Sequence, residues 1–314
     1  MDLIAITRDK IERAGDGDHA AGLKAVLLHI ETAVSHLTRG QETADETAFT
    51  DAIYRTNQAF EGGLKEAYRV LTGKKPEKKT PHQIEEYFNS NDVFRSRVLA
   101  QFKNYRTEAR NPSTHDYKLD FDSSEAFLAI VSVCAFANVL LDQVIEKIAH
   151  DRSKAAAEPE RGRLHKVLKD NEGDLPLFVA HIIAEFMKQY RPLHDSLRMR
   201  EAEIMGAMSG FIESIAPQMA LVVEAQLADQ ARSRADLLVT RDDDNLLVEL
   251  KGMQFSRMLA SAGLDQLDRY MDLSGINHAV LVVANPPFDS VELSDVKTRS
   301  GRRVVVVAPQ KIAT

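Results

Sequence analysis

Two short apolar segments joined by an acidic turn constrain the fold of this chain more than any other feature. The segments run from Ala235 to Thr240 and from Leu246 to Lys251, and residues 242–245 between them are three aspartates and an asparagine. Runs of this kind bounded by Asp and Asn predict two β-strands that form a hairpin. The C-terminal part of the chain is therefore expected to contain a sheet.

Charged side chains lie on this hairpin where a core strand would carry apolar ones. Because alternate residues of a strand share a face, Glu249 and Lys251 are expected on one face, with Val248 and Leu250 on the other. Strand pairing would bring Asp236 close to Glu249 and Lys251. Such a convergence is unfavourable unless a cation or a substrate uses it. An ordinary cross-strand ion pair between Glu249 and Lys251 is the alternative.

Asp236, followed after a short turn by Glu249-Leu250-Lys251, resembles the PD-(D/E)XK motif of restriction-endonuclease-like nucleases, with Ala235 where that family often has proline. The resemblance covers roughly the last third to half of the chain. It implies that Asp236, Glu249 and the backbone carbonyl of Leu250 bind Mg²⁺ or Mn²⁺, since hard oxygens suit these ions. It also implies that Lys251 orients or activates the attacking water and offsets charge on the phosphate.

The segment after the hairpin agrees with this resemblance. A helix from Gly263 to Tyr270 would place Gln266 and Tyr270 on one face, as in the Gln-x-x-x-Tyr helix that many of these nucleases carry after the catalytic strand. Gln266 and Tyr270 are then expected to support the site or contact the substrate. The following apolar run from His278 to Ala284 predicts a further strand.

Nucleases of this kind often place a further glutamate on the helix before the sheet. The helix predicted from Leu197 to Ile215 carries three glutamates, of which Glu201 is preferred as a metal ligand. Glu203 and Glu213 remain alternatives, and each of the three is also compatible with a solvated helix charge.

The first half of the chain has apolar residues at helical spacing and almost no strand pattern. It predicts an antiparallel bundle of four or five helices. The expected helices are Ala20–Leu37, Glu46–Leu71, Thr80–Phe88, Asp92–Thr107 and Ser124–Ala149.

A second motif lies between the fourth and fifth of these helices. Arg110-Asn111-Pro112 and then His115, followed by an apolar helix, resemble the HEPN superfamily. The resemblance implies a dimer, a metal-independent ribonuclease site, His115 as the acid/base and Arg110 as the phosphate ligand, with Asn111 as the polar residue that commonly follows the arginine. A histidine near its ordinary pKa of ~6.5 suits proton transfer. The alternatives are that Arg110 caps a helix while His115 closes a loop, or that the domain is a catalytically silent dimerisation module.

Asp151 to Arg163 is polar and Ala-rich with Pro159 and Gly162, which predicts a linker and two domains, residues 1–157 and 158–314. The further expected elements are helices Leu164–Lys169 and Leu175–Tyr190 and strands Met219–Gln226 and Arg303–Ala308. The predicted fold class is therefore α+β, with a HEPN-like helical bundle before an α/β nuclease-like domain that has a central mixed sheet.

Composition limits the protein classes. With 314 residues and one cysteine, Cys134, the chain is expected to be cytoplasmic and to have no disulfide framework. The apolar segment Ala126 to Leu141 falls short of the ~20 residues of a membrane span, so no membrane association is expected. The net charge of −7 argues against a protein that coats nucleic acid indiscriminately. Two basic patches could still meet phosphates: Lys74, Lys75, Lys78 and Lys79, and Arg299, Arg302 and Arg303.

Taken together, the sequence predicts a Mg²⁺-dependent endonuclease that hydrolyses phosphodiester bonds, with DNA favoured over RNA. Its partners would be nucleic acid, a second copy of the chain in a homodimer or higher oligomer, and an unidentified activator. Two nuclease-type domains in one chain suggest a prokaryotic anti-phage defence or toxin-like role, by analogy alone. The alternatives are a HEPN ribonuclease effector whose α/β domain senses or binds nucleic acid, and a non-catalytic nucleic-acid-binding regulator.

Overall fold

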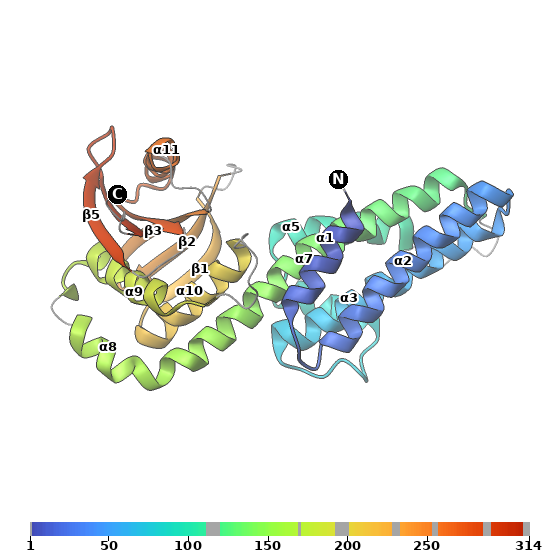
Figure 1. Cartoon of the computed structure of the whole chain (residues 1–314), viewed down its shortest axis with the longest axis horizontal. Helices are drawn as coiled ribbons and strands as arrows, with labels where there is room; N and C mark the ends of the chain where they lie inside the picture. The colour runs from blue at the N-terminus through green and yellow to red at the C-terminus, as the bar shows by residue number, and fades with distance from the viewer. Residues whose placement is uncertain are drawn as a thin grey trace. The chain divides into compact units, whose positions relative to one another are not determined.

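A computed structural model of the chain describes residues 2–110, 120–168, 171–191, 201–227, 233–252, 257–284 and 290–309. It forms two compact units, Met1–Ile148 and Ala149–Thr314, drawn in Figure 1. The first unit is helical and the second contains a mixed sheet of six strands. The predicted α+β class and the predicted order of a helical half before a sheet-containing half are confirmed.

The helical unit is built from long amphipathic helices. Its described helices are α1 (Leu3–Ala14), α2 (Ala20–Thr43), α3 (Thr47–Thr72), α4 (Pro81–Ser90), α5 (Ser96–Tyr105), a π-helical segment (Arg106–Arg110) and most of α7 (Ser123–Ala157). Local signals set several ends: Thr80 and Gln83 form a capping box at the start of α4, and Gly73 at φ 68° ends α3. The core contains the packed rings of Phe60, Phe102 and Phe136.

The second unit has helices on both faces of its sheet. The helices are α8 (Arg161–Leu168), α9 (Leu175–Gln189), α10 (Glu201–Ile215) and α11 (Arg257–Ser274), and the strands are β1 (Ala220–Gln226), β2 (Arg234–Arg241), β3 (Asp244–Gly252), β4 (His278–Ala284), β5 (Val291–Lys297) and β6 (Arg303–Pro309). The strand order is β1-β2-β3-β4-β6-β5, with β3, β4 and β6 parallel and the other pairs antiparallel.

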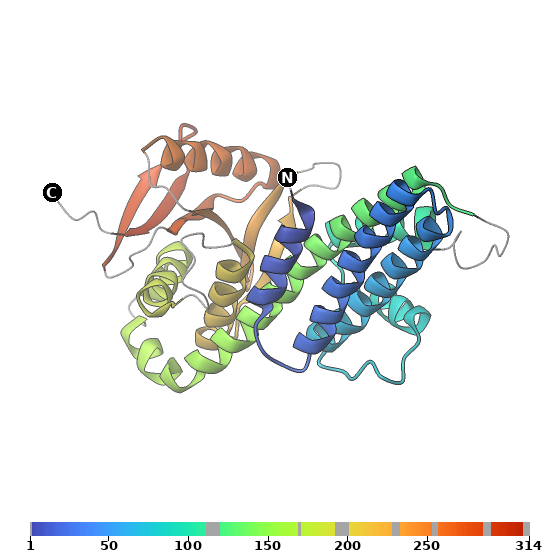
Figure 2. The same cartoon turned by 45° about the vertical axis from the view of Figure 1, so that its right-hand side comes forward.

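One core lies between the sheet and the helices α9 and α10, and a smaller core lies between the opposite face and α11 (Figures 1 and 2). Strand β3 contributes to both cores in alternation, with Val248 and Leu250 on the α9/α10 face and Leu247 on the α11 face. The period of two predicted from the sequence is therefore confirmed for this strand.

Three sequence expectations differ from the structure. The segment Asp151–Arg163 is helical: α7 continues to Ala157, a 3₁₀ turn spans Glu158–Glu160, and α8 follows. Its alanines, lysine and arginines are good helix formers, and Pro159 sits in the first turn of the 3₁₀ segment, where proline is tolerated. The compact units accordingly meet at Ile148 and Ala149, nine residues before the expected boundary at 157/158. Helix α1 and strand β5 were not predicted.

The apolar segment from Ala126 to Leu141 lies inside α7. In the described part of the chain, the helical stretch Ser123–Leu168 is long and apolar enough to cross a membrane, and 61% of its most apolar window is buried within the protein. Such burial is typical of the core helix of a soluble protein.

Candidate active site on the sheet

The β2–β3 hairpin positions the two carboxylates of the predicted motif. Its turn is the two residues Asp242 and Asp243, and the strands pair antiparallel from Arg241↔Asp244 to Leu237↔Val248. Asp236 and Glu249 are the next residues in this register, so they lie beside each other on neighbouring strands. Asp236 Oδ2 accepts a hydrogen bond of 2.7 Å from the backbone N–H of Leu250, which holds its carboxylate at the end of β3.

A hydrogen-bonded group of side chains covers the α11 face of this strand end. Lys251 Nζ lies 2.7 Å from Glu249 Oε1 and 2.7 Å from Gln266 Oε1. Gln266 Nε2 donates to Glu249 Oε1 at 2.6 Å and to the hydroxyl of Tyr270 at 2.8 Å. The structure thus brings together Glu249, Lys251, Gln266 and Tyr270, with Asp236 on the adjoining strand.

Burial makes this group electrostatically unusual. Glu249 is only 1% exposed, and its Oε2 has no hydrogen-bond partner within the described structure. Burial first, and then the charge of Glu249, raise the pKa of Asp236 to about 7. Burial also raises the pKa of Glu249, against the opposing effect of the Lys251 amine. A bound cation would relieve the repulsion between these carboxylates and give the Oε2 atom a partner.

The three glutamates of α10 lie in different surroundings. Glu201 is exposed at the first turn, and its charge raises the pKa of both Asp236 and Glu249. Glu203 is buried and accepts a hydrogen bond of 3.2 Å from the Tyr190 hydroxyl. Glu213 accepts from Lys154 Nζ and contacts His150. Of the three, Glu201 is therefore the one that interacts electrostatically with the hairpin carboxylates.

The donor set fits a hard divalent cation in type. Asp236, Glu249 and the carbonyl of Leu250 supply oxygen atoms, which Mg²⁺ and Mn²⁺ prefer. No group of three or more His, Cys, Asp or Glu side chains gathers as metal ligands in the described ranges. The candidate site therefore has two carboxylates at its centre, and solvent and substrate oxygens would complete the coordination, as is usual for Mg²⁺.

Gly263 is a residue of this site that the sequence did not single out. A Cβ at this position of α11 would lie 2.9 Å from Leu281 Cδ1 and 3.4 Å from Lys251 Cγ. A glycine here lets the helix approach the sheet beside Lys251 and brings Gln266 within reach of the amine. The available signal was a glycine one turn before Gln266 in an otherwise helical pattern.

The structure describes only part of the second motif. The backbone of Arg110 ends the π-helical segment Arg106–Arg110. The Arg110 side chain, Asn111 and His115 lie outside the described residues, so the geometry of the predicted ribonuclease pair rests on the sequence alone.

The C-terminal basic patch is largely paired with carboxylates. Arg302 contacts Asp272, and Arg303 contacts Asp174 and Asp295. Arg299 remains 82% exposed in the side chain although it lies 3.3 Å from Asp265. In the N-terminal patch, Lys74 Nζ donates to the Tyr87 hydroxyl at 3.0 Å.

Comparison with family models, with curated proteins and with solved structures finds no match to this chain.

Proposed function

We propose that the C-terminal unit is a Mg²⁺-dependent (or Mn²⁺-dependent) nuclease that hydrolyses phosphodiester bonds at the end of the β2–β3 hairpin. The observation that carries this proposal is the carboxylate pair beside Lys251, in which Glu249 is buried and Asp236 is partly buried. Two carboxylates in that position are unfavourable for folding, as the raised pKa of Asp236 reflects. A cation-binding role accounts for both carboxylates and for the amine together.

Each side chain has a distinct task in this proposal. Asp236 and Glu249 hold the cation, and the Leu250 N–H keeps the Asp236 carboxylate in place. A bound divalent ion supplies Lewis-acid polarisation of the phosphate and lowers the pKa of the attacking water. Lys251, held by Glu249 and Gln266, positions that water and offsets the negative charge that develops on the phosphate. Gln266 and Tyr270 support the lysine.

Support for a phosphodiester substrate comes from charge. A phosphodiester is an anion that needs cationic groups, and the site offers one amine next to a predicted cation. DNA is favoured over RNA by the resemblance to restriction-endonuclease-like proteins. In the same proposal the helical unit is HEPN-like and pairs two copies of the chain, and the protein acts in the prokaryotic cytoplasm as an anti-phage or toxin-like effector after a trigger.

A cleavage assay tests this proposal. Labelled plasmid DNA, single-stranded DNA and structured RNA are incubated with the full-length protein in Mg²⁺, in Mn²⁺ and in EDTA. We expect cation-dependent cleavage that is lost in Lys251→Ala and retained in Lys297→Ala, the matched replacement of an exposed lysine on β5. Cleavage by Lys251→Ala at the wild-type rate would refute the assigned site.

A second candidate function is a ribonuclease centred on Arg110 and His115 in the helical unit. The observation in its favour is the π-helical segment that ends at Arg110, because π-helical turns are rare and frequently lie at functional sites. This candidate predicts RNA cleavage that resists EDTA, is lost in His115→Ala and persists in Lys251→Ala. The third alternative, a nucleic-acid-binding regulator without activity, predicts binding of nucleic acid with no cleavage in any of these conditions.

A further inference from the structure

Helix α11 covers only part of the sheet face that carries the candidate site. It packs against β3 and β4, and its Gln266, which is bonded to Glu249 and Lys251, closes that side of the site. The β1–β2 part of the same face is more open, since Val222 on β1 is 50% exposed. A substrate bound at the carboxylates therefore has room to extend over β1 and β2.

Strand alternation shows which side chains lie on this open part. Leu221 and Val223 pack in the α9/α10 core, so Val222 between them points to the α11 face. The register pairs Val222 with Leu238, which contributes to the α11 core from the edge. We call the two cross-strand pairs on this face the β1/β2 strip, which consists of Ala220, Val222, Leu238 and Thr240.

The β1/β2 strip begins directly beside the candidate site. Leu238 is two residues from Asp236 on β2, which is about 7 Å along the strand. All four side chains of the strip are uncharged, and two of them, Val222 and Leu238, are large and apolar. A strand of nucleic acid that places a phosphate at Asp236 and Glu249 would therefore meet an apolar surface with its neighbouring nucleotide.

The cationic groups near the strip lie at its ends. Strand β1 has no lysine or arginine, and β2 carries its two arginines at its first and last positions, Arg234 and Arg241. Arg241 donates to the carbonyl of Glu172 at 2.8 Å and lies over the Phe178 ring. Duplex binding depends heavily on lysine and arginine contacts to phosphates, which the strip does not supply.

An unpaired strand suits the strip better than a duplex does. In a duplex the base faces are stacked on one another, whereas an unpaired strand can turn the faces of its bases to the protein, and proteins that bind single strands use those faces. Apolar side chains such as Val222 and Leu238 can contact a base face without a phosphate beside them.

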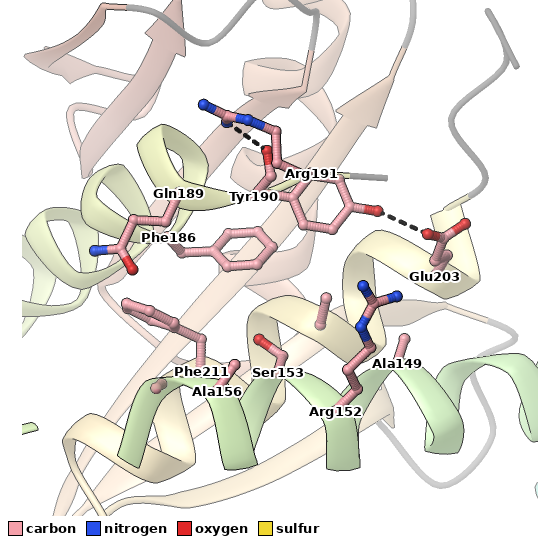
Figure 3. A pocket seen from close by; sticks show the side chains of 12 residues that line it. Ala149, Arg152, Ser153, Ala156, Phe186, Gln189, Tyr190, Arg191, Glu203 and Phe211 are labelled. Carbon is pink, nitrogen blue, oxygen red and sulfur yellow. Dashed lines mark hydrogen bonds between the residues drawn. The ribbon is translucent and has the colours of Figure 1, made fainter. Parts of the chain in front are cut away.

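The cavity of the C-terminal unit lies elsewhere. It measures about 210 Å³ and is bounded by the last turns of α7, the end of α9 and the start of α10 (Figure 3). Its rings Phe186 and Phe211 belong to the α9/α10 core, on the opposite face of the sheet from Lys251 and Gln266. The surface that continues the candidate site is therefore the β1/β2 strip.

We propose that the β1/β2 strip holds the bases of an unpaired strand that runs into the candidate site, so that the substrate class is single-stranded nucleic acid. The proposal rests on the proposed nuclease function, because the strand is directed to Asp236 and Glu249. It adds a position that determines specificity, Val222, and a preference between unpaired and paired substrates.

The test is fluorescence anisotropy with labelled oligothymidylate, free or annealed to oligoadenylate. Full-length Lys251→Ala protein in Mg²⁺ is used, so that cleavage does not consume the probe. We expect the single strand to bind at least about tenfold more tightly than the duplex, and Val222→Asp to weaken the single strand about tenfold through lost apolar contact. Val167→Asp, which replaces a valine of α8 that is 61% exposed, is the matched control and should bind as its parent does.

A milder variant separates binding from folding. Val222→Thr keeps a β-branched side chain that suits a strand, and it exchanges one methyl group for a hydroxyl. It should weaken the single strand by about threefold and leave duplex binding unchanged, whereas Val167→Thr should change neither.

Three results would overturn the proposal: duplex binding as tight as single-strand binding, unchanged single-strand binding by both Val222 variants, or no single-strand binding tighter than about 1 mM. Failure of the nuclease proposal looks different, because it appears as a wild type that binds no Mn²⁺, whatever the oligonucleotide affinities are. Cleavage of duplex DNA that depends on Lys251, together with one of the three results, would leave the nuclease and remove the strip.

Discussion

Replacing Asp236 by asparagine should stabilise the protein, and the gain should depend on pH. Burial and the charge of Glu249 raise the pKa of Asp236 from its ordinary 3.8 to about 7 in the folded protein. Each tenfold change in proton affinity is worth ~1.36 kcal/mol, so the ionised carboxylate destabilises the fold by about 4 kcal/mol. Asparagine keeps an oxygen that can accept the Leu250 N–H and carries no charge.

The sign of the pH dependence follows from proton binding. Between pH 3.8 and about 7 the folded protein holds a proton on Asp236 that the unfolded chain has lost. The free energy of unfolding of the wild type therefore falls as the pH rises through this range. The advantage of Asp236→Asn should be about 4 kcal/mol at about pH 8 and under about 2 kcal/mol at about pH 5.

Thermal unfolding of the wild type and Asp236→Asn in buffers without divalent cations measures this difference. We expect a higher midpoint for the variant at about pH 8, by roughly 10 °C for a domain of this size, and a smaller difference at about pH 5. Asp243→Asn, an exposed residue of the same hairpin turn, is the control and should follow the wild type. Parallel pH profiles of wild type and Asp236→Asn would refute the buried-carboxylate argument.

Three further predictions concern Gln266, which holds Lys251 in the candidate site, and two buried positions, Cys134 and Gly210. Gln266→Leu should lower cleavage roughly 10–100-fold in steady-state assays, because residues that orient a metal site commonly have effects of this size. Cys134 is 1% exposed and burial raises its pKa to about 11, so thiol reagents should label it only after denaturation. Gly210→Ala should lower the free energy of unfolding by about 1–3 kcal/mol or more, and the thermal midpoint with it, since a Cβ at this position would lie 2.2 Å from the carbonyl oxygen of His150. Gly162→Ala meets nothing within 4 Å and should not destabilise in the same melt.

Periodicity predicted much of this fold. The helices α2, α3, α4, α9 and α10 and five of the strands have apolar patterns long enough to identify them. Strand β5 (Val291–Lys297) was not predicted because Ser294 and Asp295 interrupt its alternation of apolar and polar residues, and it lies at the edge of the sheet, where few apolar residues are needed. The polar composition of Asp151 to Arg163 predicts a linker, whereas its residues form helix readily and Ala157 packs in the C-terminal core.

The candidate site was predictable where chemistry follows from spacing. Alternation in a strand placed Glu249 and Lys251 together, and the helical period placed Gln266 beside Tyr270. The bond from the Leu250 N–H to Asp236 could not be foreseen, because it depends on how the hairpin ends in three dimensions. The cavity around Phe186 was also hidden, since its walls come from three helices far apart in the sequence.

The central claim is tested most directly by titrating the full-length protein with Mn²⁺ and measuring the concentration of free Mn²⁺ at each step. In the proposed function, cation binding precedes cleavage, so its measurement needs neither the correct nucleic acid nor an activator. We predict saturable binding by the wild type at about pH 8 and at least about tenfold weaker binding by Glu249→Gln, which removes one of two charged ligands. Wild-type protein that binds no Mn²⁺, or a Glu249→Gln variant that binds it as tightly, would contradict the assignment of Asp236 and Glu249 as a metal site.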